Sequence, residues 1–147
     1  MSITGFMLNW SNFDNVLEKA AGRLTQTDEV LASLGELLRS QSWRNFEQEQ
    51  APDGRKWKQS RRAAAQSGKT LQNSARLRSS ITYKKASLEK AVYVGTNLPY
   101  AAIHQFGGRT GRNRRVNMPP RPYIGLNKEI MDEAQAILSD FLTASFK

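Results

Sequence analysis

A helical repeat of apolar residues that stops at a proline determines the longest element of this chain. Capping and acidic residues at positions 27–29 come just before the repeat, as is usual at helix starts. Pro52 cannot continue a helix, and the Asp53-Gly54 pair that follows it favours a turn. The spacing therefore predicts a helix near residues 27–50. Its apolar face holds Val30, Leu31, Leu34, Leu37 and Leu38.

The second half of this helix carries two aromatic residues that lie off the apolar face. Trp43 lies about 180° around the helix from Leu34, and Phe46 lies between the two directions. Either the two aromatic side chains pack on the segment that follows, with Trp57 as a candidate contact, or they contact another subunit. A shorter helix is predicted upstream, from Asn12 to Arg23.

The basic middle of the chain holds the clearest strand pattern. Residues 55–72 are polar with few large apolar side chains, so irregular chain with at most a helical turn is expected there. Apolar and polar residues alternate over 79–85 and 91–96, which predicts two antiparallel strands around a turn near 87–89. We expect this hairpin to form the centre of the sheet.

Proline in the first turn and glycine after the last predict a short helix over residues 98–106. Gly107 is expected to end it in the left-handed conformation. The phrase YAAIHQFGG should then form a compact hub that packs on the predicted hairpin. The packing side chains are expected to be Tyr100, Ile103 and Phe106.

An exposed, irregular loop is expected after this helix. Residues 109–116 place arginines among Gly, Thr and Asn, and this composition has too few apolar side chains to be buried. The proline-rich stretch 118–122 should be extended, and 123–126 could form another strand. Asn127 is expected to cap a final helix. The predicted fold is α+β, with N-terminal and C-terminal helices packed on a small antiparallel β-sheet and long basic loops, in a single domain spanning 1–147.

The net charge of +9 is concentrated in the middle of the chain. Residues 1–50 sum to −3 and residues 123–147 to −2, whereas residues 51–122 carry +14. Such a charge favours contact with nucleic acid or with an acidic protein surface, and it does not choose between them. With neither a signal peptide pattern nor a long apolar run, we expect a soluble, unexported protein.

The sequence offers little from which to build a catalytic or metal site. Cysteine is absent, which excludes thiolate catalysis and disulfides. His104 is the single histidine and has no carboxylate near it in the sequence, so we expect a structural role and neither a metal nor a cofactor. Glu47 and Glu49 lie two apart on a predicted helix and therefore face different sides. Residues 107–112 look superficially like a phosphate loop, but they follow a predicted helix and lack the Gly-Lys-Ser/Thr ending.

A role in nucleic-acid binding is the main alternative to a role in protein assembly. Basic residues near the aromatic side chains could combine phosphate contacts with base stacking. Core packing explains the same aromatic positions, and no nucleic-acid-binding motif is present. The aromatic residues concerned are Trp57, Tyr83, Tyr93 and Tyr100.

Four phrases, taken in order, resemble the phage virion morphogenesis family, that of the Mu G protein and the tail-completion S proteins. The resemblance covers most of the chain after about residue 28. The family often has glycine where this chain has Ala75. The phrases are FEQEQAPDGRKW at 46–57, LQNSARLRSSI at 71–81, VYVGTNLPYAAIHQFGG at 92–108 and MPPRPYIGL at 118–126.

The resemblance implies a non-catalytic structural protein that acts in tail completion or head-tail joining, as part of a homo-oligomeric ring at the neck or tail end. Its expected location is the virion, after assembly in the cytoplasm of the bacterial host. The expected partners are other neck or tail proteins, with non-specific DNA contact as a further option and no membrane. The structural motif comprises Trp57, Tyr100, His104, Phe106 and Gly107.

The arginine-rich loop is the candidate partner-binding segment. Its flexible spacers would let it adopt the shape of an acidic partner ring, or face DNA that passes through the junction. The alternative is a loop that only increases solubility. The four residues are Arg109, Arg112, Arg114 and Arg115.

Overall fold

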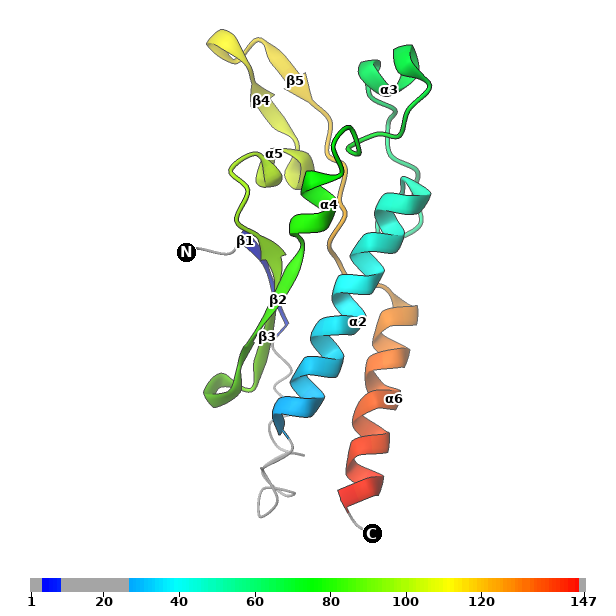
Figure 1. Cartoon of the computed structure of the whole chain (residues 1–147), viewed down its shortest axis with the longest axis vertical. Helices are drawn as coiled ribbons and strands as arrows, with labels where there is room; N and C mark the ends of the chain where they lie inside the picture. Colours follow the sequence, from blue (N-terminus) through cyan, green and yellow to red (C-terminus); the bar gives the residue numbers. More distant parts are fainter. Residues whose placement is uncertain (1–3, 9–26, 146–147) are drawn as a thin grey trace.

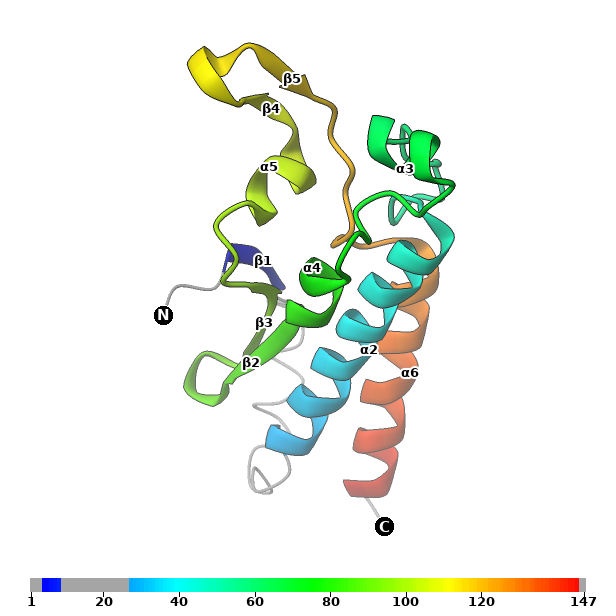
Figure 2. The ribbon, with the colours of Figure 1, turned by 45° about the horizontal axis from the view of Figure 1, so that its top comes forward.

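The computed structural model describes residues 4–8 and 27–145, which form three layers (Figure 1). Helix α2 (Thr27–Gln48) lies in the middle, with helix α6 (Lys128–Ser145) beside it and an antiparallel sheet on its other side, as Figure 2 also shows. The predicted α+β class is confirmed. The strand order is β1 (Thr4–Leu8), β3 (Ala91–Thr96) and β2 (Thr82–Ala86).

The predicted hairpin is confirmed in β2 and β3, which pair antiparallel around a short 3-10 turn, η2 (Ser87–Glu89). Only β3 is central, because β1 pairs with its other edge and leaves β2 at the side. Residues 79–80 belong to helix α4 (Arg76–Ser80) instead of the first strand. The predicted helix at 12–23 lies outside the described residues.

The long helix is confirmed, and two features of its sequence explain where it packs and stops. Gly35 faces the Tyr83 ring so closely that a Cβ at this position would overlap it, so glycine lets the helix approach β2. After the helix, Gly54 adopts a φ of +87° and donates its N–H to the Ala51 carbonyl at 2.9 Å. The chain thus turns where the Pro-Asp-Gly sequence predicts.

An aromatic cluster joins three distant parts of the chain. The fully buried Phe46 ring meets the Trp57 ring edge-on at 5.5 Å and the Tyr123 ring at 5.1 Å. Trp57 Nε1 donates to the Pro122 carbonyl at 2.8 Å, and the Tyr123 hydroxyl donates to the Ala101 carbonyl at 2.9 Å. Phe46 therefore packs on the segment that follows the helix, as one of the two alternatives predicts.

Trp43 packs against the hydrophobic core that contains these three rings, and it also contacts two arginines. Its indole is partly buried, and the guanidinium groups of Arg39 and Arg78 lie 5.1 and 5.5 Å from the ring centroid. Both arginines also pair with carboxylates of the same helix, Glu36 and Glu47. Cation-π contacts thus add to the packing of the Trp43 ring on the core cluster, which includes Trp57.

The prediction of a strand at 123–126 is wrong, although this segment is in the core. Side chains take the place of a neighbouring strand: the Gln105 carboxamide oxygen accepts from the Tyr123 and Ile124 N–H groups at 3.0 and 3.2 Å. Gln105 Nε2 donates to the Ile124 carbonyl at 2.8 Å, and Asn45 Nδ2 donates to the Tyr123 carbonyl at 3.2 Å. These bonds satisfy the buried backbone without a β-ladder.

The predicted hub at helix α5 (Ala101–Phe106) is wrong in its packing face. Ala101 and Gln105, four residues apart, are buried, whereas the Phe106 side chain is 64% exposed and that of Tyr100 39% exposed. Phe106 and Tyr100 therefore do not pack into the core, since the buried face must carry the carboxamide that binds the 123–124 backbone. Ile103 is only partly buried.

Gly107 ends α5 as predicted, but in a different conformation. Its φ is +71° and its ψ is −176°, which is not the left-handed helical conformation. A Cβ at this position would lie 2.7 Å from the Pro120 nitrogen and 2.8 Å from the Met118 carbonyl oxygen. Glycine is required here by positive φ and by the close approach of the proline-rich segment.

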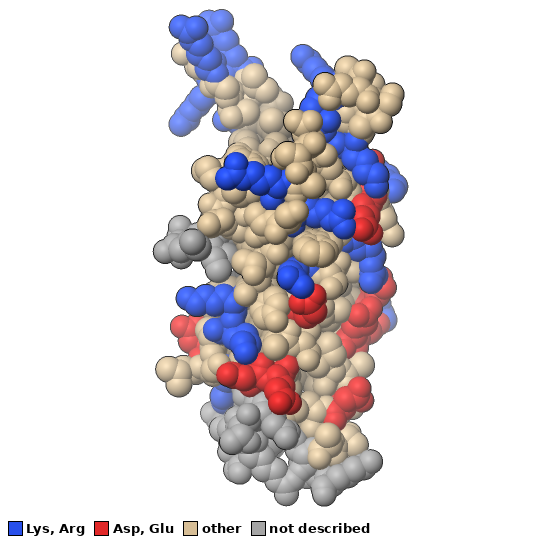
Figure 3. All heavy atoms as spheres, viewed as in Figure 1, with Lys and Arg blue, Asp and Glu red and all other residues tan. Residues whose placement is uncertain are grey.

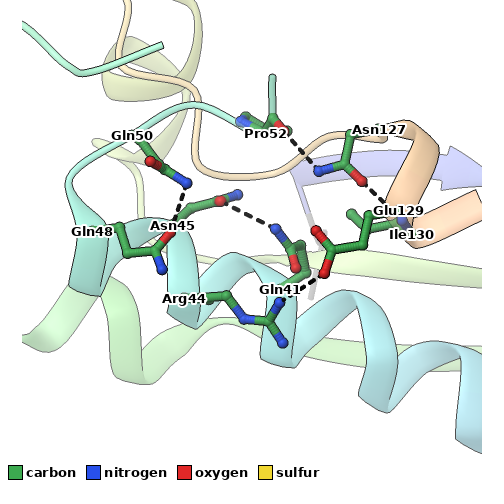
Figure 4. Close-up of polar contacts among 9 residues, drawn as sticks. All are labelled: Gln41, Arg44, Asn45, Gln48, Gln50, Pro52, Asn127, Glu129 and Ile130. Atoms are coloured by element: carbon green, nitrogen blue, oxygen red, sulfur yellow. Dashed lines mark hydrogen bonds and ion pairs between the residues drawn. The ribbon is translucent and has the colours of Figure 1, made fainter. Parts of the chain in front are cut away.

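Asn127 caps α6, which confirms the predicted helix start (Figure 4). Its Oδ1 accepts from the Ile130 N–H at 2.8 Å, and its Nδ2 donates to the Pro52 carbonyl at 2.8 Å. The cap therefore ties α6 to the turn after α2, and Arg44 reinforces the contact with Glu129 at 3.4 Å. In the described ranges, no helix combines the length and apolar character needed to cross a membrane.

The strained backbone at Ala75 generates the first prediction. Ala75 precedes α4 with φ 56° and ψ 8°, a left-handed conformation that costs an alanine about 1 kcal/mol and costs glycine little. We expect Ala75→Gly to raise the free energy of unfolding by about 0.5 to 1 kcal/mol in urea titrations. Ala64→Gly, on the exposed side of helix α3 (Arg61–Gln66), is the control and should lower it by about the same amount. Destabilisation by both changes would contradict the prediction.

The packing of α5 predicts opposite outcomes for two adjacent residues. Gln105→Leu leaves three buried backbone groups unpaired and should lower the free energy of unfolding by about 3 kcal/mol or more. Phe106→Ala removes a mostly exposed ring and should change the same free energy by less than about 1 kcal/mol. Chemical denaturation of both variants checks this, and a larger loss from Phe106→Ala would overturn the assignment of the buried face.

Candidate functional site

The arginine-rich segment forms a β-hairpin that projects from one end of the molecule (Figures 1 and 2). Strand β4 (Gly108–Thr110) pairs antiparallel with β5 (Val116–Met118), with Thr110 opposite Val116. A short turn, η3 (Arg112–Arg114), joins them. The prediction of an exposed segment holds, but the segment is a hairpin and not an irregular loop.

Residues that tolerate positive φ explain why this polar segment can turn back on itself. Gly111 has φ 78° and Asn113 has φ 57°, both in the region that glycine and asparagine adopt most readily, and Arg114 follows in the same region with φ 52°. The β4–β5 backbone bonds, rather than side-chain packing, hold the strands together, because even Val116 is 51% exposed. Composition predicts the exposure correctly but misses the turn geometry.

The hairpin arginines are exposed and carry no ion pair within the part of the chain that the structure describes. Figure 3 shows Lys and Arg side chains gathered at the end of the molecule that carries this hairpin and α3. Positive potential at this end is therefore uncompensated, and it attracts anionic surfaces. The residues are Arg109, Arg112, Arg114 and Arg115.

A groove of about 780 Å³ runs between the base of the hairpin and the segment at 58–77. Arg121, only 4% exposed, contributes to its lining, and its Nε donates to the Lys58 carbonyl at 2.7 Å. The Arg121 N–H also donates to the His104 carbonyl at 2.8 Å. The sequence gives one signal of this groove, an arginine that stands between prolines, but composition alone does not reveal its burial.

His104 lies in the same groove, partly buried. Its ring meets the Tyr100 ring edge-on at 6.1 Å, and its Nδ1 has no hydrogen-bond partner among the described residues. Burial, and then the nearby Arg121 charge, lower the pKa of His104 below its ordinary value of 6.5. The neutral imidazole is therefore favoured, and within the described part of the chain no carboxylate orients the ring as catalysis by a His-acid pair would require.

Of the remaining residues of the structural motif, Tyr100 lines the groove and the other three do not. Trp57 belongs to the aromatic core, and Gly107 permits the crossing of two backbone segments. Tyr100 lines the groove, whereas Phe106 is exposed outside it. In the described ranges, no three His, Asp or Glu side chains come together as metal ligands would.

Comparison with known proteins gives one family and two relatives. The model of the phage virion morphogenesis family matches residues 8–143. Mu-like prophage FluMu G protein 2 of Haemophilus influenzae is 36% identical over 132 residues, which cover 90% of this chain and 88% of that protein. FluMu G protein 1 of the same organism is 30% identical over 120 residues, 76% of each chain. No solved structure matches.

The lowered pKa of His104 predicts a pH dependence of stability. Below pH 6.5 the unfolded chain binds a proton that the folded protein resists, so stability is lost as the pH falls through 6.5 towards the folded pKa. This contribution is fully present above that value. We expect His104→Gln to lose less stability than the wild type between about pH 7 and pH 5, measured by urea unfolding. Equal losses in the two proteins would contradict the assignment.

Proposed function

The chain belongs to the phage virion morphogenesis family, and from this premise we propose that it completes tails or joins heads to tails as a non-catalytic subunit of a ring. The ring would lie at the neck or tail end of the virion. Other neck or tail proteins would be its partners, after assembly in the host cytoplasm. The family match over residues 8–143 is the observation that carries the proposal.

The projecting hairpin supports this role. A ring subunit needs surfaces that fit its neighbour and the next ring, and a heterologous contact closes into a ring when its rotation allows. The β4–β5 hairpin extends beyond the layered body with four arginines exposed. An acidic surface on a neighbouring ring would pair with these side chains, and the hairpin would act as the docking arm.

The surroundings of His104 support the non-catalytic part of the proposal. A general base needs a group that orients it and a pKa near the working pH. The pKa of His104 is lowered by burial and by a neighbouring cation, with no carboxylate partner among the described residues. A packed, neutral imidazole is consistent with a structural role.

A nucleic-acid-binding accessory protein is the second candidate. The observation that favours it is the +14 charge of residues 51–122, much of which is displayed at one end of the molecule (Figure 3). DNA that passes through a neck would meet such a surface. DNA contact would weaken steeply as salt rises in oligonucleotide titrations, whereas docking on a protein would persist without DNA.

Removal of the hairpin charges tests the assembly role directly. A phage that lacks the gene should yield unjoined heads and tails or abnormal tails in electron micrographs. Complementation with the variant Arg109→Ser, Arg112→Ser, Arg114→Ser and Arg115→Ser should restore fewer joined particles than the wild-type gene, at least about tenfold fewer if docking loses about 1.4 kcal/mol. The purified variant should keep its melting temperature within a few degrees, because the four side chains are exposed.

A matched pair of variants separates docking from general loss of charge. Arg112→Ser with Arg114→Ser removes two exposed charges from the hairpin, and Lys84→Ser with Lys85→Ser removes two exposed charges from β2. Only the hairpin pair should reduce joined particles. Normal virions from the gene deletion would overturn the assembly role, and equal effects of both pairs would overturn the role of the hairpin.

A further inference from the structure

Arg121 is a buried cation for which no counterion is seen among the described residues. Its exposed fraction is 4%, and burial lowers its pKa without changing its charge at physiological pH. Among the described residues the guanidinium makes two contacts: Nε donates to the Lys58 backbone carbonyl, and Nη1 lies 3.5 Å from the Met118 sulfur, a weak acceptor. A buried charge is costly unless it is paired, so a carboxylate that reached this group would be strongly favoured.

The groove that contains Arg121 is cationic on every side. Asp and Glu are absent from the described residues that line it. Exposed cations from α3, from the start of α4 and from the end of the hairpin turn surround the buried one. The basic lining residues are Lys58, Arg61, Arg62, Arg76, Arg115 and Arg121.

Apolar side chains share the groove with these cations, and they favour a polypeptide occupant. Leu71, Leu77 and Met118 offer aliphatic contacts beside the charges. A carboxylate at the tip of a side chain can reach a buried guanidinium and form two parallel hydrogen bonds with it. A phosphodiester can accept the same pair of hydrogen bonds, but among the described residues that line the groove only Tyr100 and His104 carry aromatic rings on which bases could stack.

We propose that this groove binds an acidic segment of a partner protein, with one carboxylate paired to Arg121 and others to Arg61, Arg76 and Arg115. The inference rests on the proposed function, because it gives the chemistry of the partner that docks beside the hairpin. Long-range attraction by the hairpin would bring the partner close, and the groove would fix its position. Aliphatic residues between the acidic ones would contact the apolar side chains.

A labelled peptide of alternating glutamate and leucine is the probe, with a glutamine-leucine peptide and a labelled oligothymidylate as controls. Binding to the full-length protein is followed by fluorescence anisotropy at about 0.15 M salt, where the Debye length is about 8 Å. The glutamate peptide should bind at least about tenfold more tightly than the glutamine peptide, the ratio that 1.4 kcal/mol gives. Equal binding of the two peptides would overturn the inference.

Two double variants of equal charge locate the binding. Arg61→Ser with Arg76→Ser removes exposed arginines from the groove, and Arg109→Ser with Arg112→Ser removes exposed arginines from the hairpin outside it. The groove pair should weaken peptide binding about fivefold or more, and the hairpin pair by less than about twofold. Equal weakening would show general charge attraction and would overturn the inference.

Arg121→Lys tests the buried guanidinium itself, since lysine keeps the charge and loses the planar pair of donors. The Arg121→Lys variant should bind the peptide about tenfold more weakly, which corresponds to a loss of about 1.4 kcal/mol of binding free energy. If this variant unfolds, methyl NMR of the wild type decides: the peptide should shift the Leu71, Leu77 and Met118 methyl signals. Absence of these shifts would overturn the inference, as would tighter groove binding by oligothymidylate.

The assembly assay separates the failure of this inference from the failure of the proposed function. If the gene deletion gives normal virions while the peptide still binds in the groove, the assembly role is contradicted and the groove assignment holds. If the deletion gives defective virions but the peptide does not bind, the groove assignment is contradicted and the assembly role holds.

Discussion

Hydrogen bonds from the Gln105 carboxamide to the 123–124 backbone are the interaction on which the rest of the structure depends. A segment in the core must satisfy its N–H and C=O groups, and here a glutamine and Asn45 do what a neighbouring strand would do. Tyr123 is thereby held against Phe46, and the chain then continues to the Asn127 cap. These contacts together connect α5, α2 and α6. They also explain why a segment with an apolar sequence does not join the sheet.

The same contacts determine which surface the protein displays. Adjacent residues of a helix point about 100° apart, so the inward position of Gln105 leaves the Phe106 side chain exposed. Gly107 then lets the chain leave the helix over the Pro120 backbone, and the hairpin projects from that point. The exposed arginines are therefore placed by a rigid base, which agrees with the general tendency of functional loops to extend from a well-packed scaffold.

The sequence predicts those elements that local chemistry determines. The long helix, its Pro-Asp-Gly turn, the β2–β3 hairpin and the Asn127 cap each depend on neighbouring residues, and each is present. Errors occur where a distant contact decides. The inward position of Gln105 depends on a segment about twenty residues away, so helical spacing around Phe106 could not reveal it. For the candidate site, composition predicts the exposed arginines, but neither the burial of Arg121 nor its groove, because both depend on how 58–77 packs beside α5.

The charge of the middle segment divides into two kinds of cation that differ in what they can recognise. Exposed arginines on the hairpin act over roughly a Debye length, about 8 Å at physiological salt, and attract any anionic surface. A buried arginine acts only on a group that enters the groove, and it discriminates by shape because a misplaced carboxylate leaves both charges unpaired. Ordered assembly needs both rapid association and selection of the right partner, because rapid association alone would also admit wrong partners. The exposed arginines would serve the first need and the groove the second. The two kinds of cation are close together, because Arg115 of the hairpin segment lines the groove, and this proximity would link the attraction of the proposed partner to its placement.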